Sequence, residues 1–156
     1  MDLYKVEETY DDIKDGNISS IFSIIQNNLI PYDTEESSIK AIRNLYNKDN
    51  LNIFFEKNFF NTDERIKLLG KIFYQYKKEL RENNLVDFDD LINLSVKILE
   101  NDNVRRKMQE KYEYIMVDEF QDTNYAQIKL LDALINEKNN IVVVGDDSQS
   151  IYGWRG

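Results

Sequence analysis

The stretch Tyr114–Gly156, YIMVDEFQDTNYAQIKLLDALINEKNNIVVVGDDSQSIYGWRG, contains two short apolar runs that both end at acidic residues. Tyr114–Val117 is followed by Asp118–Glu119, and Ile141–Val144 is followed by Gly145–Asp147. Unbroken apolar runs of this length are typical of strands that are covered on both faces. A helix between two such strands is the usual connection in a parallel sheet. The stretch therefore predicts a strand–helix–strand unit of an α/β fold.

The segment between the two runs has the apolar spacing of a helix. Four residues would share one face of it: Ile128, Leu131, Leu134 and Ile135. Asn124, with Gln127 three residues later, matches a capping box at the start of this helix. Asp122 is an alternative cap for the same helix.

Acidic residues gather where ligands of parallel sheets bind, beyond the carboxyl ends of the strands. They are Asp118, Glu119, Asp122, Asp146 and Asp147. The only basic residue in the same loops is Arg155. Because clustered carboxylates repel one another and are costly to desolvate, they need a cation. Mg²⁺ that carries a phosphate is a hard ion with oxygen ligands and meets this need, so we interpret the edge as half of a nucleotide site.

Two motifs in this stretch resemble those of one enzyme family. Residues 117–124, VDEFQDTN, resemble the Walker B motif of the UvrD/Rep/PcrA superfamily 1 DNA helicases. Residues 144–156, VGDDSQSIYGWRG, resemble their motif III, and residues 85–91, LVDFDDL, resemble the short segment that precedes Walker B. The resemblance implies that residues 86–156 are part of a RecA-like P-loop NTPase domain (1A). It also implies that residues 1–85 are a helical subdomain (1B).

The resemblance assigns roles in ATP hydrolysis to three residues. Asp118 would hold Mg²⁺, directly or through water, since phosphoryl transfer depends on positioning and charge neutralisation. Glu119 would orient and deprotonate the attacking water. Gln149, which can both donate and accept hydrogen bonds, would contact the γ-phosphate and report its presence to the DNA site. ATP and Mg²⁺ are thus the expected cofactors. Three further residues are expected to hold the loops together: Gln121, Asp122 and Asp146.

The end of the chain carries the residues expected to bind DNA. Tyr152 and Trp154 offer aromatic faces on which bases of a single strand stack, at about 1–3 kcal/mol per base and without sequence readout. Arg155 can contact phosphate or stack through its guanidinium. An isolated Trp154 would be better interpreted as a core or hinge residue, and the flanking motif reverses that preference. The resemblance implies single-stranded DNA and duplex junctions as partners and 3′-to-5′ translocation.

Residues 1–110 are expected to form helices joined by short polar segments. Apolar stripes at helical spacing predict helices near residues 18–25, 34–46, 63–82 and 87–99. The predicted core residues include Ile21, Phe22, Ile25, Ile42, Leu45, Leu69, Phe73, Phe88 and Leu91. Asp87 is predicted to cap the last of these helices. Residues 51–60 fit a short helix or a buried turn.

Lysines lie opposite the apolar stripe of the helix near residues 63–82. Lys71, Lys77 and Lys78 favour a solvated face, with a phosphate-contacting face as the alternative. Arg105–Lys107, before the first strand, is interpreted as a solvated helix end.

Composition excludes several other classes of function. A net charge of −9 argues against a general polyanion-binding surface, because phosphates are neutralised by clustered Lys and Arg. With no cysteine and no histidine, disulfides, thiolate metal sites and imidazole catalysis are absent. No apolar run approaches the roughly 18 residues that would span a membrane, and we expect a cytoplasmic protein without a membrane partner.

The sequence lacks the phosphate-binding P-loop, G-x-x-x-x-G-K-[ST], that this family needs. Of its five glycines only Gly70 is followed by lysine, and Ile72 stands where serine or threonine is required. We therefore expect an internal fragment of a longer helicase, separated from its remaining motor domains and unable to hydrolyse ATP alone. Two alternatives are the helicase subunit of a recombination helicase–nuclease and a non-catalytic module that binds DNA or a partner. The ending Tyr152–Gly156 favours the UvrD/Rep/PcrA side over the helicase–nucleases.

Overall fold

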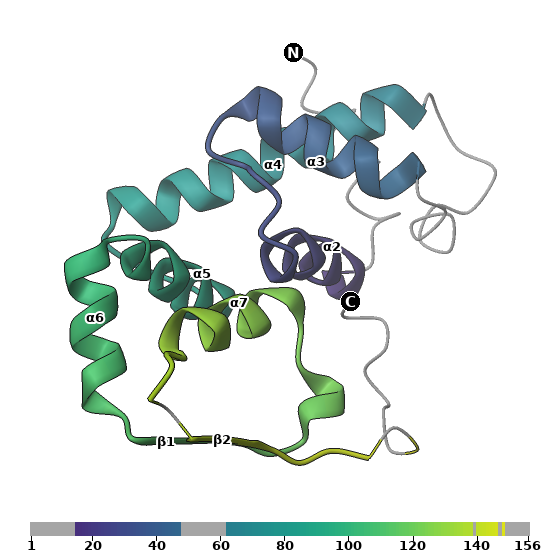
Figure 1. Ribbon diagram of the computed structural model, residues 1–156. Coiled ribbons are helices and arrows are strands. Elements are labelled where there is room, and N and C mark those ends of the chain that lie inside the picture. Colours follow the sequence, from purple (N-terminus) through teal and green to yellow (C-terminus); the bar gives the residue numbers. More distant parts are fainter. Residues whose placement is uncertain (1–14, 48–61, 139, 147, 149–156) are drawn as a thin grey trace. The chain divides into compact units, whose positions relative to one another are not determined.

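The computed structural model describes residues 15–47, 62–138, 140–146 and 148 (Figure 1). Its elements are α2 (Asp15–Asn27), α3 (Glu35–Asn47), α4 (Thr62–Glu82), α5 (Phe88–Leu99), α6 (Asp102–Lys111), β1 (Tyr114–Val117), the 3₁₀-helix η1 (Phe120–Asp122), α7 (Tyr125–Leu134) and β2 (Asn140–Val143). The four predicted helices are confirmed to within a few residues at each end, while residues 51–60 lie outside the described ranges. The fold is α/β, mostly helical with one small parallel sheet. None of the helices described is long and apolar enough to cross a membrane.

The chain divides into two compact units. Unit 1 comprises residues 1–25 and 30–85, and unit 2 comprises residues 26–29 and 86–156. Unit 1 contains α3, α4 and most of α2, and unit 2 contains the remaining helices and the sheet. The correspondence of these units to helicase subdomains 1B and 1A stays a prediction.

Unit 1 is built around a closed apolar core. Three helices supply it: Ile21, Phe22 and Ile25 from α2, Ala41, Ile42 and Leu45 from α3, and Ile66, Leu69 and Phe73 from α4. Phe73 is completely buried, and its ring centroid lies 4.4 Å from that of Phe22 and 5.0 Å from that of Tyr32. The apolar spacing of these three helices therefore predicted the core correctly.

Gly70 allows α3 and α4 to approach each other closely. A Cβ atom at this position would lie 2.6 Å from the Cα atom of Ile39 and 2.7 Å from its backbone nitrogen. Because a backbone cannot move away as a flexible side chain can, no larger residue fits here without shifting a helix. The close approach accounts for a glycine inside a helix, where alanine would be favoured by about 1 kcal/mol.

Lys77 contradicts the prediction of a solvated lysine face on α4. It is only 3% exposed, and its Nζ atom lies 5.4 Å from the ring centroid of Tyr32 and 5.7 Å from that of Tyr76. Lys71 and Lys78, by contrast, are about half exposed and form ion pairs with exposed glutamates. The prediction is wrong for Lys77 because the residue is buried in unit 1, where the rings of Tyr32 and Tyr76 attract its ammonium group.

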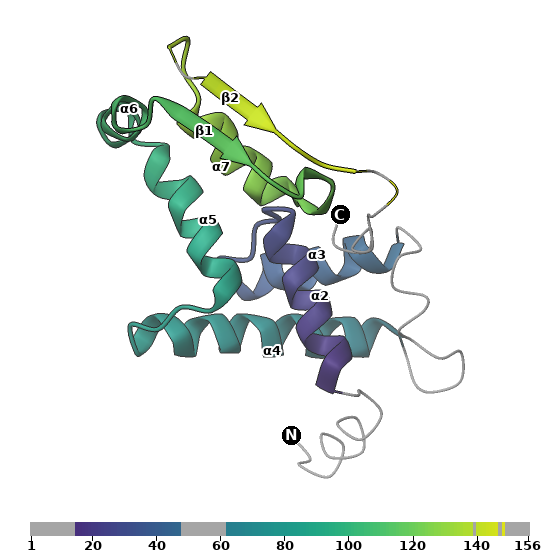
Figure 2. The same ribbon diagram turned by 90° about the horizontal axis from the view of Figure 1, so that it is seen from below.

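The predicted strand–helix–strand unit is present in unit 2. β1 and β2 pair in parallel, with Tyr114 opposite Asn140 and Val117 opposite Val143. α7 connects them and lies on one face of the sheet (Figures 1 and 2). The strands place the residues that follow Val117 and Val143 at the same edge of the sheet.

The helix caps predicted from the sequence at Asn124 and Asp87 are confirmed. At the start of α7, the Asn124 side chain accepts a hydrogen bond from the Gln127 backbone, and the Gln127 side chain accepts one from the Asn124 backbone, both at 2.9 Å. Asp122 therefore does not cap this helix and lies in η1. Asp87 caps α5 and forms a second capping box with Asp90.

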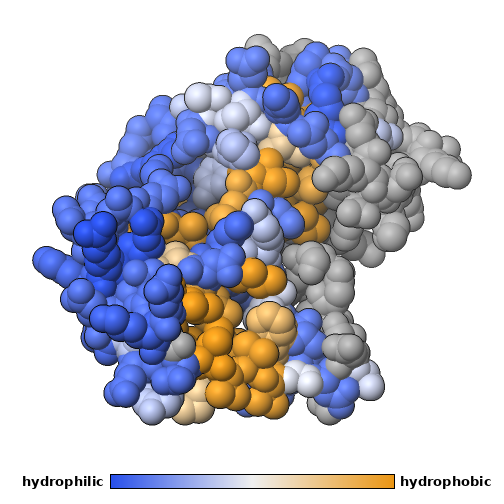
Figure 3. Space-filling view, in the orientation of Figure 1, coloured by the Kyte–Doolittle hydropathy of each residue, from blue (hydrophilic) through white to orange (hydrophobic). Residues whose placement is uncertain are grey.

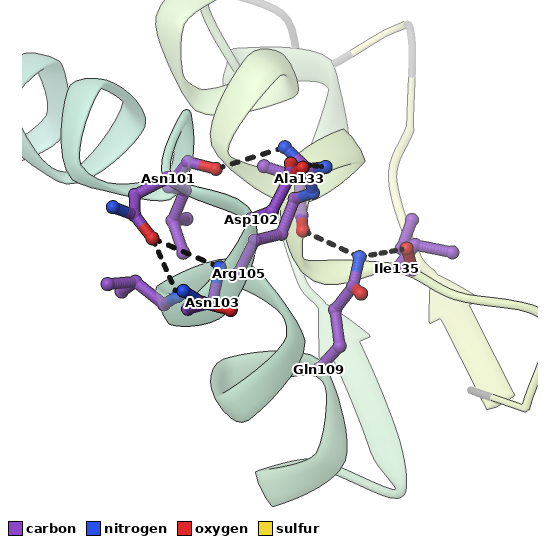
Figure 4. A network of polar contacts seen from close by, with 9 residues as sticks. Asn101, Asp102, Asn103, Arg105, Gln109, Ala133 and Ile135 are labelled. Atoms are coloured by element: carbon purple, nitrogen blue, oxygen red, sulfur yellow. Dashed lines mark hydrogen bonds and ion pairs between the residues drawn. The ribbon is translucent and has the colours of Figure 1, made fainter.

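Polar side chains join α6 to its neighbours in unit 2 (Figure 4). Asn101 caps α6 by accepting hydrogen bonds from the backbone of Asn103 and Val104. The Gln109 side chain donates to the carbonyls of Ala133 and Ile135 at the end of α7, at 3.0 and 2.9 Å. These carbonyls belong to a helix end, where intrahelical partners are missing, so Gln109 fixes α6 against α7.

Unit 2 exposes apolar side chains that the sequence predicted to be buried. Phe88 is 90% exposed, Leu91 53% and Met116 78%, and hydrophobic side chains reach the surface where α7 and the strands lie (Figure 3). The predictions of strands covered on both faces and of Phe88 and Leu91 in the core are therefore wrong. The reason is that α7 covers only one face of the sheet, and no other described element covers Phe88 and Leu91.

Candidate nucleotide site

The loops that follow β1 and β2 lie side by side at one edge of the sheet. The backbone N–H of Val144 donates to the carbonyl of Val117 at 2.8 Å, and that of Phe120 donates to the carbonyl of Val144 at 2.9 Å. This pairing continues the ladder past both strands. It brings Asp118 and Glu119 next to the loop that contains Asp146, as the parallel register predicted.

Glu119 adopts a left-handed backbone conformation, with φ 53° and ψ 42°. This conformation costs a residue other than glycine roughly 1–2 kcal/mol. Two hydrogen bonds hold it: the Glu119 N–H donates to Oδ1 of Asp118 at 3.0 Å, and its carbonyl accepts from the Asp122 N–H at 2.9 Å. The resulting sharp turn leaves the carboxylates of Asp118 and Glu119 exposed at the edge of the sheet.

Gln121 joins the two loops through both ends of its side-chain amide. Its Nε2 donates to Oε2 of Glu119 at 2.5 Å, and its Oε1 accepts from the Asp146 N–H at 2.9 Å. The prediction that Gln121 holds the loops together is confirmed. Sequence reasoning missed its direct contact with Glu119, for which the only signal was an amide two residues from a carboxylate.

Gly145 leaves room for this bridge. A Cβ atom at position 145 would lie 2.7 Å from Oε1 of Gln121 and 3.2 Å from its backbone nitrogen. Any side chain there would push the Gln121 amide away from Asp146. The glycine is therefore required by the close approach of the two loops.

The other predicted site residues have the following places. Asp122 lies in η1, and its Oδ1 is buried without a hydrogen-bond partner in the described part of the chain. Asp146 turns the loop by accepting a hydrogen bond from the Ser148 N–H at 2.9 Å. The remaining residues lie outside the described ranges: Asp147, Gln149, Tyr152, Trp154 and Arg155.

The carboxylate of Asp118 fits a Mg²⁺ ligand of the kind that acts together with a nucleotide. Mg²⁺ is usually bound by one or two carboxylates, with phosphate oxygens and waters completing its octahedron. Asp118 is exposed at the strand end, and one of its oxygens already accepts the Glu119 N–H. Within residues 15–47, 62–138, 140–146 and 148, no group of three or more acidic side chains could hold a metal by itself. The exposed carboxylate of Asp118 could supply one ligand of such an ion.

An open pocket lies at the opposite edge of the sheet, where the strands begin. It is lined by Arg106, Gln109, Glu110, Tyr112, Glu113, Asn136, Glu137 and Lys138. This lining mixes both charges and contains none of the residues that follow the strands. The pocket is thus separate from the acidic edge.

Comparisons with known proteins agree with the motifs at this edge. The family model described as the UvrD/REP helicase N-terminal domain matches residues 4–156. The chain belongs to this family. It is 41% identical to ATP-dependent DNA helicase Rep of Buchnera aphidicola subsp. Schizaphis graminum (strain Sg) over 129 residues, which cover 76% of this chain and 20% of that protein.

Two further relatives belong to the same group of helicases. ATP-dependent DNA helicase Rep of Escherichia coli (strain K12) is 44% identical over 94 residues, or 60% of this chain and 14% of that protein. ATP-dependent DNA helicase PcrA of Staphylococcus aureus (strain Mu50) is 43% identical over 96 residues, or 61% of this chain and 13% of that protein. The UvrD/REP family chain described here thus matches a fifth or less of each relative's length.

Proposed function

We propose that this chain is part of an ATP-dependent DNA helicase that translocates 3′ to 5′ on single-stranded DNA and unwinds duplex junctions in repair or replication. Unit 2 would be a piece of a RecA-like motor domain and unit 1 a helical subdomain. The main observation in support is that the two acidic loops lie together at one edge of the sheet. Hydrogen bonds of the Val144 backbone and of the Gln121 side-chain amide join them. The names of the Rep and PcrA relatives support the same activity. A cytoplasmic location is part of this proposal.

The residues at the edge would divide the work of hydrolysis. Asp118 would hold Mg²⁺, and the ion would supply charge neutralisation on the phosphates. Glu119 accepts the proton of the attacking water, and its exposure at the strand end leaves it open to that water. Gln149 contacts the γ-phosphate and links its presence to the DNA-binding segment.

Tyr152, Trp154 and Arg155 would bind the translocating strand. Bases stack on the two aromatic rings, and the guanidinium of Arg155 contacts phosphate or stacks in turn. Stacking requires no particular base, which suits a motor that must move along any sequence.

The proposed motor needs a P-loop that these 156 residues do not contain. The chain alone is expected to release no phosphate from ATP, with or without DNA, because nothing cradles the triphosphate. A complete polypeptide that supplies a P-loop together with this chain is expected to be an active, DNA-stimulated ATPase.

The test compares three forms of that complete polypeptide by DNA-stimulated phosphate release. E119Q should lower kcat by about 10²-fold or more, since general-base catalysis contributes about 10²–10⁴. E79Q is the matched control, because Glu79 is an exposed glutamate on α4 that also accepts a hydrogen bond from a glutamine. Equal activity of E119Q and E79Q would contradict the role of Glu119, and the absence of DNA-stimulated phosphate release from all three forms would favour a non-catalytic module.

A further inference from the structure

Building on the proposed function, we propose that Gln121 is a positioning residue for hydrolysis. Its amide holds the Glu119 carboxylate in place and ties it to the main chain of the loop at Gly145–Asp146. That loop leads directly to Gln149 and the terminal aromatic residues. Gln121 would thus orient the proposed catalytic glutamate and connect it to the facing loop.

The two partners of Gln121 fix the orientation of its amide. A carboxylate only accepts hydrogen bonds, and a backbone N–H only donates them. The NH₂ group must therefore face Glu119, at 2.5 Å, and the carbonyl oxygen must face the Asp146 N–H, at 2.9 Å. Rotating the amide by 180° would lose both bonds, so the bridge has one stable arrangement.

Few other side chains could replace this bridge. Glutamate at position 121 would accept from Asp146 but would place a second carboxylate against Glu119, and the like charges would repel. An alanine or leucine would make neither bond. Asparagine carries the same amide on a side chain one methylene shorter, which cannot span the same separation. The geometry thus selects an amide of glutamine length.

The backbone around Gln121 is arranged to present it to both loops. The left-handed turn at Glu119 starts η1, which contains Gln121, and η1 is closed by bonds from Asp122 and Thr123 to the turn. On the facing loop, Gly145 has no Cβ to displace Oε1 of Gln121. Both loops are therefore shaped around this side chain.

The bridge makes the position of Glu119 depend on the loop at Asp146. If that loop moves, the Asp146 N–H withdraws from Oε1, and the amide that orients Glu119 loses one of its two anchors. Glu119 is then free to leave the position from which it deprotonates water, and misplacement of a catalytic group by about 1 Å can cost about 10²-fold in rate. Gln121 thus connects the hydrolytic centre to the segment that precedes the proposed DNA-binding residues.

The first test measures the bridge itself in the 156-residue chain. In Q121A, the ¹⁵N order parameter of the Asp146 amide should fall from the range of rigid backbone, about 0.85, toward that of flexible backbone, below about 0.6. The amides of Met116 and Val142 in the strands should stay unchanged. Q75A is the matched control, because Gln75 also donates to an exposed glutamate, Glu79, at 2.7 Å. An unchanged Asp146 amide in Q121A would overturn the inference.

The second test measures ATP hydrolysis by the complete polypeptide. Q121A should lower kcat about tenfold or more while KM for ATP stays within about twofold, because a lost positioning contact acts on the transition state. Q121E should be at least as slow, and Q75A should match the unsubstituted protein. Rates of Q121A equal to those of Q75A, in a protein that E119Q inactivates, would overturn the positioning role alone. An active E119Q would instead overturn the proposed function, so the two failures are distinguishable.

Discussion

Units 1 and 2 have similar proportions of apolar residues but differ in how many of these side chains are buried. In unit 1 three helices enclose their apolar side chains, and Phe73 is completely buried. In unit 2 Phe88 is 90% exposed, and all four residues of β2 are exposed. The acidic loops of the candidate nucleotide site also belong to unit 2. The same apolar pattern can therefore close a core, as in unit 1, or remain at the surface beside a site, as in unit 2.

The largest expected effect on stability comes from comparing alanine substitutions of Phe73 and Phe88. Phe73→Ala should lower the free energy of unfolding by about 3–5 kcal/mol, because it leaves a cavity in a closed core. Phe88→Ala removes the same atoms from an exposed position and should change it by no more than about 0.5 kcal/mol. Urea denaturation of the 156-residue chain measures both, and equal effects would refute the contrast between the units.

Replacing Gly70 and Gly145 by alanine should have different effects on stability, because different atoms lie close to the two glycines. Gly70→Ala forces a Cβ against the backbone of Ile39 and should cost about 1–3 kcal/mol of unfolding free energy. Gly145→Ala meets the end of the flexible Gln121 side chain, so it should change stability by only about 0.5 kcal/mol. It should nevertheless shift the amide resonance of Asp146. A large loss of unfolding free energy in G145A, with the Asp146 amide resonance unchanged, would contradict this prediction.

The sequence predicted features that depend on local interactions. The capping box of Asn124 and Gln127 requires only neighbours in the chain, and the stripes of α2, α3 and α4 require only a helical period. The sequence could not predict what covers an apolar face, and for that reason Phe88 and Leu91 were wrongly placed in the core. Covering elements are set by tertiary packing, which periodicity does not encode.

The chemical groups of the site were predicted better than their contacts. The parallel register brings Glu119 and Asp146 to one edge, as the acidic ends of the two runs indicated. The left-handed turn at Glu119 was not predicted, since glutamate has no preference for that conformation. Lys77 was misplaced for a similar reason, because its burial depends on Tyr32, which is distant in the sequence.

A smaller effect separates buried from solvated lysines within unit 1. Lys77→Ala should cost about 1–2 kcal/mol, since it removes a covered stem and contacts between a cation and aromatic rings. Lys71→Ala removes an exposed ion pair with Glu35 at 3.6 Å and should cost no more than about 0.5 kcal/mol. Thermal unfolding of the two variants checks this order, and a larger loss in K71A would reverse it.

The smallest effect concerns the pH dependence of unit 1. A hydrogen bond from Lys67, with the charges of Arg43 and Lys67, holds the pKa of Asp63 below its ordinary value of 3.8. Because the folded-state pKa is the lower one, this stabilisation is present above the ordinary pKa and is lost as the pH falls through the folded-state value. Lys67→Met should raise the pKa of Asp63, as measured by NMR titration of its carboxyl group. Lys71→Met is the control and should leave it unchanged.

We propose that the acidic edge of unit 2 and the terminal aromatic residues serve one motor. The most direct test of this proposal is the fluorescence of Trp154, the only tryptophan in these 156 residues, isolated in the complete polypeptide by subtracting the signal of W154F. Emission should change when oligo-dT binds, and change again when Mg-ATP is added to the E119Q form, in which hydrolysis is expected to be about 10²-fold slower or more. The proposal would be contradicted if the emission of Trp154 stayed unchanged at saturating oligo-dT. It would also be contradicted if the emission changed with DNA but not with Mg-ATP.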